Sequence, residues 1–482
     1  MSTATNLLAK RPGPVARFVA VAALAGWLPA SQAVTQCTDE AVLAEPARSN
    51  VAKAASKWMR PVSLTTGAAI GSSNVQQADD PLTQLQSIVR EASKRSAEVS
   101  AAQLEAQAAT HDLDEAKGAR YPQVAVSGRV GRSESSVDVP TNGRQTSVAL
   151  NVGAPLIDFG RTSYVIDWRS RLADVAQLGY VSAREQVVLD AVTTAIERNR
   201  YRLQAQVYQQ YARKMSCLVN VLEQIVAEDK GRASELVQAR KTQLQAEISR
   251  DTAIAQTRQI EARLRKQIGA DYQPGDGITV PLMPVPDLLD ITRQLLDNSE
   301  VRQLHLQAEA LDNYAKAVSA GQKPQLNWLI SKAAGRSGSV NSGSWTAGVT
   351  VSYTIFNGFS DQAAMSAALK RADAAREREA ELIASRQSKA VEVHDSATSA
   401  FARAKSYAMV LRDSDRVRDN TFRQWSELGR RSLFDVMSAE SDHYNLRIAY
   451  VNALHDGYEA NAQLRSLGAG LAAWLDPQQA PQ

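Results

Sequence analysis

Residues that could do catalytic or metal chemistry are few in this sequence, and their spacing does not bring them together. There are five histidines: His111, His305, His394, His443 and His455. None of them stands in an H-E-x-x-H pattern or in another compact metal-binding motif. The pairs His394-Asp395 and His455-Asp456 face different ways on a helix, which is typical of polar surface residues. The sequence also lacks a phosphate-binding loop, a dinucleotide fingerprint and a nucleophile elbow. It therefore predicts a protein that is not an enzyme and that uses no cofactor or metal.

One cluster of charged residues could interact with passing ions rather than catalyse a reaction. In SELGRRSLFDVMSAE, Gly429 stands at a predicted helix break, with Arg430 and Arg431 beside it, Ser432 as an N-cap and Asp435 one turn further on. For Ser432 the favoured interpretation is capping alone. For Arg431 and Asp435, ordinary stabilisation of the helix terminus competes with a functional interpretation. In a symmetric assembly each charge recurs as a ring, and such a ring can narrow a pore mouth and select cations.

This cluster lies at the turn of a predicted helical hairpin, and an earlier hairpin has the same plan. No proline interrupts residues 162–229, and apolar residues recur there every three or four positions. An amphipathic helix of that length spans about 100 Å. Gly231 breaks it, and a shorter helix returns from Ser234 to Ile268. The second hairpin repeats this plan over residues 360–467.

Both hairpins belong to a larger internal duplication. YPQV at Tyr121 corresponds to KPQL at Lys323, 202 residues later, and LIDFGR at Leu156 corresponds to IFNGFS at Ile355, 199 residues later. The hairpin turns and the helix ends correspond in the same order. These landmarks predict two copies of one unit, each with a helix, two strands, a long helix and a shorter helix.

The predicted organisation follows from these landmarks. It consists of a signal peptide (1–33), an irregular N-terminal arm (34–80), a first repeat (81–270), a proline-rich linker (271–287), a second repeat (288–470) and a C-terminal tail (471–482).

The strands of each copy alternate apolar and polar residues. In WTAGVTVSYTIF, apolar residues occupy one face and small polar residues, mostly hydroxyl-bearing, the other. An apolar face with aromatic residues near both ends suits lipid, and a hydroxyl face suits water. A soluble sandwich with a dry core is the alternative, but four strands are too few to make one. The predicted lipid face includes Val148, Leu150, Val152, Trp328, Trp345, Val349, Val351 and Tyr353.

Four strands are also too few to close a barrel, because natural barrels begin at about eight strands. The chain must therefore share its barrel with copies of itself. Two copies would give eight strands and three would give twelve, and this arithmetic does not choose. Long helices that run from such a barrel to a remote hairpin turn would form a tube. A soluble coiled-coil scaffold is the competing class, for which the helices suffice but the strands and an export signal are superfluous.

The N-terminus has the pattern of an export signal. Lys10, Arg11 and Arg17 precede the apolar run FVAVAALAGWL, and Ser31 and Ala33 occupy the positions that a signal peptidase reads. The apolar run is about ten residues long, whereas a spanning helix needs about 20. We therefore expect a cleaved signal rather than a membrane anchor.

Cysteine content and charge exclude other classes. Cys37 and Cys217 are the only cysteines, so the protein is not a disulfide scaffold, although an exported compartment would permit one bridge. The preferred interpretation of Cys217 is a small buried hydrophobic residue, and pairing with Cys37 is left open. The net charge is +4, and basic and acidic residues are interleaved along the helical stretches. This pattern argues against a nucleic-acid partner.

Over residues 82–470 the chain resembles the TolC family of outer-membrane efflux and secretion channels. The marks are the strand entries YPQV and KPQL, the strand exits LIDFGR and IFNGFS, and the hairpin turns GRASELVQAR and LGRRSLFDV, all in the right order. The resemblance implies a homotrimer. Its mixed α+β fold would have four strands per chain in a 12-stranded β-barrel in the outer membrane. The barrel would be continuous with a long α-helical barrel in the periplasm.

The resemblance also implies partners and roles for residues. A periplasmic adaptor protein docks at the hairpin tips, and an inner-membrane transporter, such as an ABC transporter, supplies the energy. Asp435 matches the aspartate of the family's gate and Arg431 its arginine. Ser438 stands where a second aspartate is often found, which predicts a weaker acidic ring, and Glu235 is a looser match in the first copy. The docking tips would be Gly231, Arg232, Ser234, Gly429, Arg430 and Ser432.

Within the family, the segment from GRRSLFDVMSAE to AQLRSLGAGL is most similar to the branch that serves type I protein secretion. Drug and small-molecule efflux is the alternative, and a passive tunnel fits either cargo.

Overall fold

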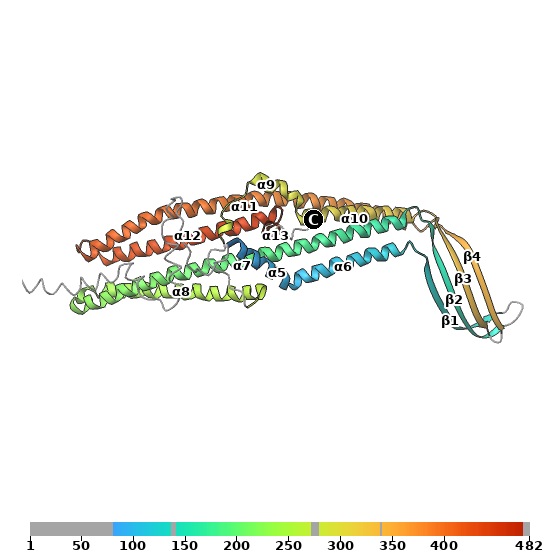
Figure 1. Cartoon of the computed structure of the whole chain (residues 1–482), viewed down its shortest axis with the longest axis horizontal. Coiled ribbons are helices and arrows are strands. Elements are labelled where there is room, and N and C mark those ends of the chain that lie inside the picture. The colour runs from blue at the N-terminus through green and yellow to red at the C-terminus, as the bar shows by residue number, and fades with distance from the viewer. Residues whose placement is uncertain (1–80, 136–140, 271–278, 338–339, 476–482) are drawn as a thin grey trace, which may run out of the picture. The chain divides into compact units, whose positions relative to one another are not determined.

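The computed structural model describes residues 81–135, 141–270, 279–337 and 340–475, and consists mainly of helices with one four-stranded sheet (Figure 1). The predicted signal peptide and N-terminal arm lie outside these residues. In chain order, with η for a 3-10 helix, the elements are α5 (Pro81–Arg95), α6 (Ala97–Gly118), β1 (Gln123–Ser135), β2 (Thr141–Ile157), α7 (Arg161–Glu228), η2 (Lys230–Arg232), α8 (Ala233–Ile268), η3 (Val280–Leu282), α9 (Leu288–Gln294), η4 (Leu295–Asp297), α10 (Ser299–Gly321), β3 (Gln325–Ser337), β4 (Val340–Ser352), α11 (Ser360–Ser426), α12 (Leu433–Leu467) and α13 (Leu471–Leu475).

The chain forms two compact units. The first, the hairpin unit, contains Thr194–Lys266 and Ala397–Glu459, and the second, the sheet unit, contains the strands with the helical segments next to them. Among the helices that the structure describes, none is both long enough and apolar enough to cross a membrane.

The hairpin unit is held together by one hydrophobic core between its two hairpins. The apolar stripe of α7, including Met215, Leu218 and Leu222, packs with Leu433 and Met437 of α12. These side chains recur every three or four positions along their helices, so one face of each helix is buried. Figure 1 shows α8 turning back along α7 and α12 turning back along α11.

The long helices begin and end close to the predicted residues, but the break at Gly231 has a different cause from the one predicted. Gly429 has a φ of 60°, the left-handed conformation that glycine adopts easily, and the Arg430 N–H donates to the carbonyl of Gln424 near the end of α11. At the other tip the predicted role of Gly231 is wrong in part. Its φ is not positive, and the turn depends on the Asp229 carboxylate, which accepts a hydrogen bond of 2.9 Å from the Gly231 N–H.

The sheet has the order β1-β2-β3-β4, and all three pairs are antiparallel. Figure 1 shows the four strands lying side by side and bending together. The strands reach far toward their loops: Asn142 and Gly143, a pair that is typical of turns, belong to β2. At the other end β4 stops at Ser352, so the prediction that Tyr353 lies within the strand is wrong.

At two junctions the chain passes from a strand to a long helix through two consecutive left-handed residues. These are Phe159 and Gly160 before α7, and Gly358 and Phe359 before α11, with φ between 52° and 85°. Asp158 fixes the first junction, because its carboxylate accepts hydrogen bonds from the N–H groups of Gly160 and Thr162 at 3.0 and 2.8 Å. The Asn-Gly in the sequence IFNGFS therefore marks a sharp reversal in which a residue without a side chain is favoured.

Candidate functional site

The register of the strands places the predicted apolar residues on one face of the sheet. Residues directly opposite each other in an antiparallel pair share a face. Leu150 lies opposite both Val126 and Lys332, and Lys332 in turn lies opposite Trp345. By the same rule seven of the eight predicted residues share this face, which we call the apolar face: Val148, Leu150, Val152, Trp328, Trp345, Val349 and Val351. That lipid covers this face stays a prediction.

The apolar face also includes one residue that sequence alternation passes over. Lys332 lies in the row between Leu150 and Trp345, although its strand reads apolar at Trp328 and Ile330. Only the strand register shows that this lysine lies on the apolar face, because in the sequence it interrupts the alternation of apolar and polar residues.

The opposite face of the sheet, which we call the polar face, carries mostly small and polar side chains, with Leu329 as an apolar exception. Ser331 on β3 donates a hydrogen bond of 2.7 Å to the Asn151 side chain on β2. From Ser331 to Ser337 exposed and half-buried residues alternate, and the half-buried ones belong to the polar face. Side chains on the inner side of a curved sheet shield one another, so the polar face is the concave one and the apolar face the convex one.

At the tip of the second hairpin, Ser432 and Asp435 form a capping box at the start of α12. The Asp435 N–H donates to Ser432 Oγ at 3.2 Å, and the Asp435 carboxylate accepts hydrogen bonds from the Ser432 N–H and hydroxyl at 3.1 and 3.0 Å. Capping by Ser432 is therefore confirmed. Arg431 donates from Nε to the side chain of Gln424 at 3.2 Å, so the structure does not join Arg431 directly to Asp435.

At the tip of the first hairpin, the residues singled out in the sequence interact with one another. Arg232 and Glu235 form an ion pair of 2.8 Å across one turn. Ser234 is exposed near the start of α8, and it is Asp229, not Ser234, whose side chain caps the turn before that helix. In the other hairpin Ser438 is exposed on α12. The gate and docking roles of these residues stay predictions.

A buried charge cluster in the hairpin unit was missed by the sequence reasoning. The Glu440 carboxylate on α12 is fully buried and lies 3.4 Å from Lys214 Nζ of α7 and 3.6 Å from an Arg418 guanidinium nitrogen of α11. His443 is also buried there, with Nε2 3.6 Å from Asp415 and Nδ1 3.3 Å from the Ser414 hydroxyl. Each residue alone reads as part of a solvated helix face, and only the packing of three helices brings them together.

His455 corrects another prediction, because it is not a surface residue. Its side chain is 1% exposed, and its Nδ1 lies 2.8 Å from the Val451 carbonyl of the same helix. Burial disfavours the charged imidazolium and lowers the pKa of His455 to about 4. The pairing His455-Asp456 gave no sign of this, because the two residues do face different ways and only the histidine points inward.

The cysteine prediction also needs correction. Cys217 is disulfide-bonded in the structure, so the interpretation of Cys217 as merely a small buried hydrophobic residue is wrong. Cys37 lies outside the described residues.

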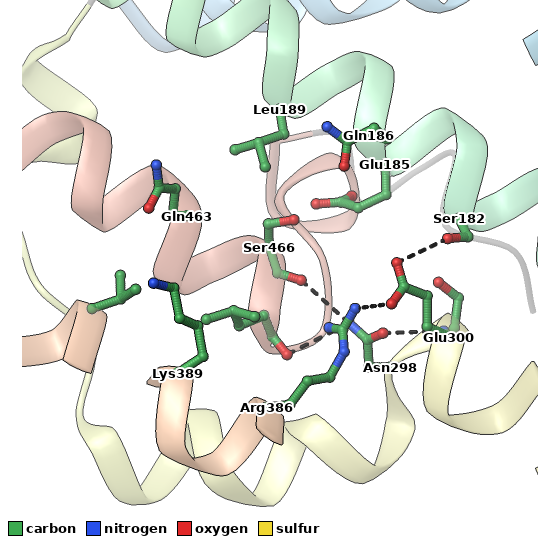
Figure 2. A pocket seen from close by; sticks show the side chains of 13 residues that line it. Ser182, Glu185, Gln186, Leu189, Asn298, Glu300, Arg386, Lys389, Gln463 and Ser466 are labelled. Carbon is green, nitrogen blue, oxygen red and sulfur yellow. Dashed lines mark hydrogen bonds and ion pairs between the residues drawn. The ribbon is translucent and has the colours of Figure 1, made fainter. Parts of the chain in front are cut away.

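Figure 2 shows a polar pocket in the sheet unit, lined by residues of α7, α10, α11 and α12 and by Asn298, which stands just before α10. Two of its polar side chains, Asn298 and Glu185, bind the backbone at helix ends. Asn298 caps α10 and donates to the carbonyl of Gly468 beyond α12 at 3.0 Å, while Glu185 accepts from the N–H groups of Leu471 and Ala472 at 2.6 and 2.9 Å. Glu300 accepts from Ser182 and pairs with Arg386. These contacts hold the surrounding helices together, so the pocket has a structural role. Leu471 and Leu475, which belong to the predicted tail, are buried as helix α13.

Within the described residues, no group of three or more histidine, cysteine or acidic side chains is arranged to hold a metal ion. What the arrangement offers is a sheet with one apolar and one polar face, and two hairpin tips that bear exposed charges and glycines.

Comparison with known proteins gives one family match and several matches in fold. The family model for outer membrane efflux proteins matches residues 88–270 and 291–470. No curated protein matches the sequence.

Several solved structures share the fold at low sequence identity. A structure of CusC, described in terms of folding and transmembrane channel formation, is 16% identical with a TM-score of 0.71, covering 80% of this chain and 92% of that one. The outer membrane protein VceC from Vibrio cholerae is 15% identical with a TM-score of 0.70, covering 80% and 96%. The CmeC outer membrane channel from Campylobacter jejuni is 13% identical with a TM-score of 0.70, covering 85% and 95%. At these identities the likeness concerns the fold.

Proposed function

Because the chain belongs to the outer membrane efflux protein family, we propose that it is a passive export channel whose sheet perforates the outer membrane. The observation that carries this proposal is the division of one curved sheet into a convex apolar face and a concave polar face. A sheet of this kind can present the first face to lipid and the second to a water-filled lumen. A scaffold in the soluble periplasm, the competing class, does not fit membership of an outer-membrane family.

The proposed assembly is a trimer. Within the chain, β1 and β4 stand at the two ends of the strand order, so each offers an edge that another strand can extend. Three chains joined through these edges would give a closed barrel of twelve strands. Two chains could also pair all of their edge strands, but the resemblance to the TolC family favours three chains.

The helical hairpins would continue the lumen as a tube in the periplasm. Their tips are suited to contact a periplasmic adaptor, because Gly231, Ser234, Gly429, Arg430 and Ser432 are exposed. Arg232 is half-buried and pairs with Glu235, so it would hold the tip in shape as well as contact a partner. An inner-membrane transporter would supply the energy, because the channel itself carries no nucleotide-binding motif in its sequence.

For the cargo we propose protein, exported with an ABC transporter and its adaptor in a type I secretion system. The support is the similarity of the second hairpin and the segment after it to that branch. Small-molecule efflux is the second candidate, and the description of the matched family favours it. Deletion of the gene separates the two: loss of a secreted protein supports the first, and sensitivity to toxic compounds with normal secretion supports the second.

Single-channel recording in planar bilayers tests the channel itself. Purified protein should insert as a discrete oligomer and give uniform conductance steps. Protein that gives no pores, including after Asp435→Ala at the proposed gate, would contradict the proposed function. A protein that sediments in detergent as a single subunit with its sheet intact would contradict the shared barrel.

A further inference from the structure

The disulfide at Cys217 raises the question of its partner. Cys217 lies on α7 in the hairpin unit, and its sulfur is bonded to a second cysteine. The sequence contains one other cysteine, Cys37, which stands in the predicted N-terminal arm. The structure contains a single chain, so the bond closes within that chain. This leaves Cys37 as the partner to consider.

The position of Cys217 suits a partner that approaches from outside the helices. Two nearby residues of α7, Met215 and Leu218, are fully buried in the core of the hairpin unit. Cys217 is half-buried and packs against that core without belonging to its fully buried part. A sulfur atom in such a position can be reached from the surface while the helices stay packed. A cysteine from a segment outside the two hairpins can therefore bond to it.

Two other fates of the cysteines fit less well. A bond between Cys217 residues of two chains leaves the third chain of the proposed trimer unpaired, because a disulfide joins thiols two at a time. A lipid on the sulfur of Cys37 would form a thioether and leave Cys217 without a partner in its own chain. Chain length is not a limit. The roughly 40 residues between Cys37 and Pro81 can span about 140 Å, which exceeds the length of about 100 Å of α7.

We infer that Cys37 and Cys217 form a disulfide within one chain, which fastens the N-terminal arm to the hairpin unit. The two thiols lose two protons and two electrons, and a thiol–disulfide oxidoreductase of the exported compartment accepts the electrons as its own disulfide becomes a dithiol. The inference rests on the export that the proposed function includes, but it does not need a pore. Because α5 begins at Pro81 in the sheet unit, residues 38–80 become an additional covalent connection between the two units.

Peptide mapping without reductant tests the bond. The full-length protein is exported with its own signal, purified from outer-membrane fractions, treated with an alkylating agent and digested with trypsin. We expect one linked pair of peptides, residues 34–48 joined to residues 215–230, which dithiothreitol separates. Wild-type protein that is unfolded without reductant should take up no maleimide, and after reduction it should take up one at each cysteine.

The matched control is Cys37→Ser, which removes one partner and leaves the core of the hairpin unit unchanged. Without reductant, this variant should take up one maleimide at Cys217 after unfolding. A maleimide on the unreduced wild type, a link between two chains on a non-reducing gel, or a lipid on Cys37 would overturn the inference. So would a Cys217 that stays blocked in Cys37→Ser.

These results are separable from a failure of the proposed function. Protein that conducts but lacks the link contradicts the disulfide alone. Linked protein that gives no pores contradicts the channel and not the disulfide.

Discussion

Asp435 combines two tasks that substitution can separate. Its carboxylate completes the capping box with Ser432, and its charge would recur around the mouth of a symmetric assembly. The cap explains why an acidic residue is placed here whether or not the mouth selects ions. A change that keeps the hydrogen bonds and removes the charge is therefore more informative than a change to alanine.

Asp435→Asn should keep part of the cap and lose the ring of charge. If the ring acts as a gate, single-channel recordings of this variant will show a higher leak conductance or weaker cation preference. Ser432→Ala is the control, because it removes the cap without changing charge and should cost about 1 kcal/mol of stability. Wild-type conductance in Asp435→Asn would reduce Asp435 to a helix cap.

His455 predicts a dependence of stability on pH. Its pKa in the folded protein is about 4, below the ordinary value of 6.5, so between these values the unfolded chain binds the proton and the folded chain does not. The contribution of His455 to stability is therefore complete above about pH 6.5 and decreases as the pH falls toward 4, by about 3 kcal/mol. Thermal unfolding at several pH values should show a shallower acid dependence in His455→Phe. The exposed His111→Phe should retain the wild-type dependence, and a His455→Phe variant that also retains it would contradict the assignment.

At the scale of elements, the buried cluster around Glu440 connects three helices of the hairpin unit. Lys214 belongs to α7, Arg418 to α11 and Glu440 to α12, so the cluster fixes how the two hairpins meet. A buried charge is costly when one partner is removed, because the remaining charges lose their compensation.

Glu440→Gln should destabilise the hairpin unit by about 3 kcal/mol or more. The control is Glu223→Gln, which removes an exposed ion pair with Arg240 in the same unit and should cost less than about 1 kcal/mol. Thermal unfolding followed by far-ultraviolet circular dichroism measures both. Equal midpoints for the two variants would show that the cluster does not hold the hairpins together.

The sequence predicts those elements that depend on local interactions, and fails where a feature depends on contacts between distant parts of the chain. The ends of α7 and α12 follow from local signals, such as the capping residue Ser432, and were predicted to within a residue or two. The end of β2 does not follow from local signals, because Asn142-Gly143 is a turn signal in isolation and yet pairs within β2. Glu440, His455 and Lys332 depend on which helix or strand lies opposite, and a single sequence does not contain that information.

At the scale of the whole molecule, the two faces of the sheet should tolerate charge very differently. Val349 and Thr350 are neighbours on β4 that point to opposite faces. Arginine on a lipid-facing position near the middle of a bilayer costs about 2–4 kcal/mol, whereas a lumen position is hydrated.

Val349→Arg should therefore reduce the amount of assembled protein in outer-membrane fractions, and Thr350→Arg should assemble normally with an altered conductance. Because both variants carry the same new charge on adjacent residues, differences in expression or export do not explain a contrast between them. If Thr350→Arg is the variant that fails to assemble, the assignment of the two faces is reversed.

The pairing of β2 with β3 has a consequence for biogenesis. It joins residues about 180 positions apart, such as Val152 and Ile330, while α7 and α8 can meet through a turn of a few residues. Contacts between distant parts of a chain form slowly, because a long loop must close first. The first hairpin should thus fold early after export. The apolar strands β1 and β2 would lack their partner β3, and would expose an edge prone to aggregation, until the C-terminal half of the chain has been exported. We therefore expect maturation to depend on periplasmic chaperones.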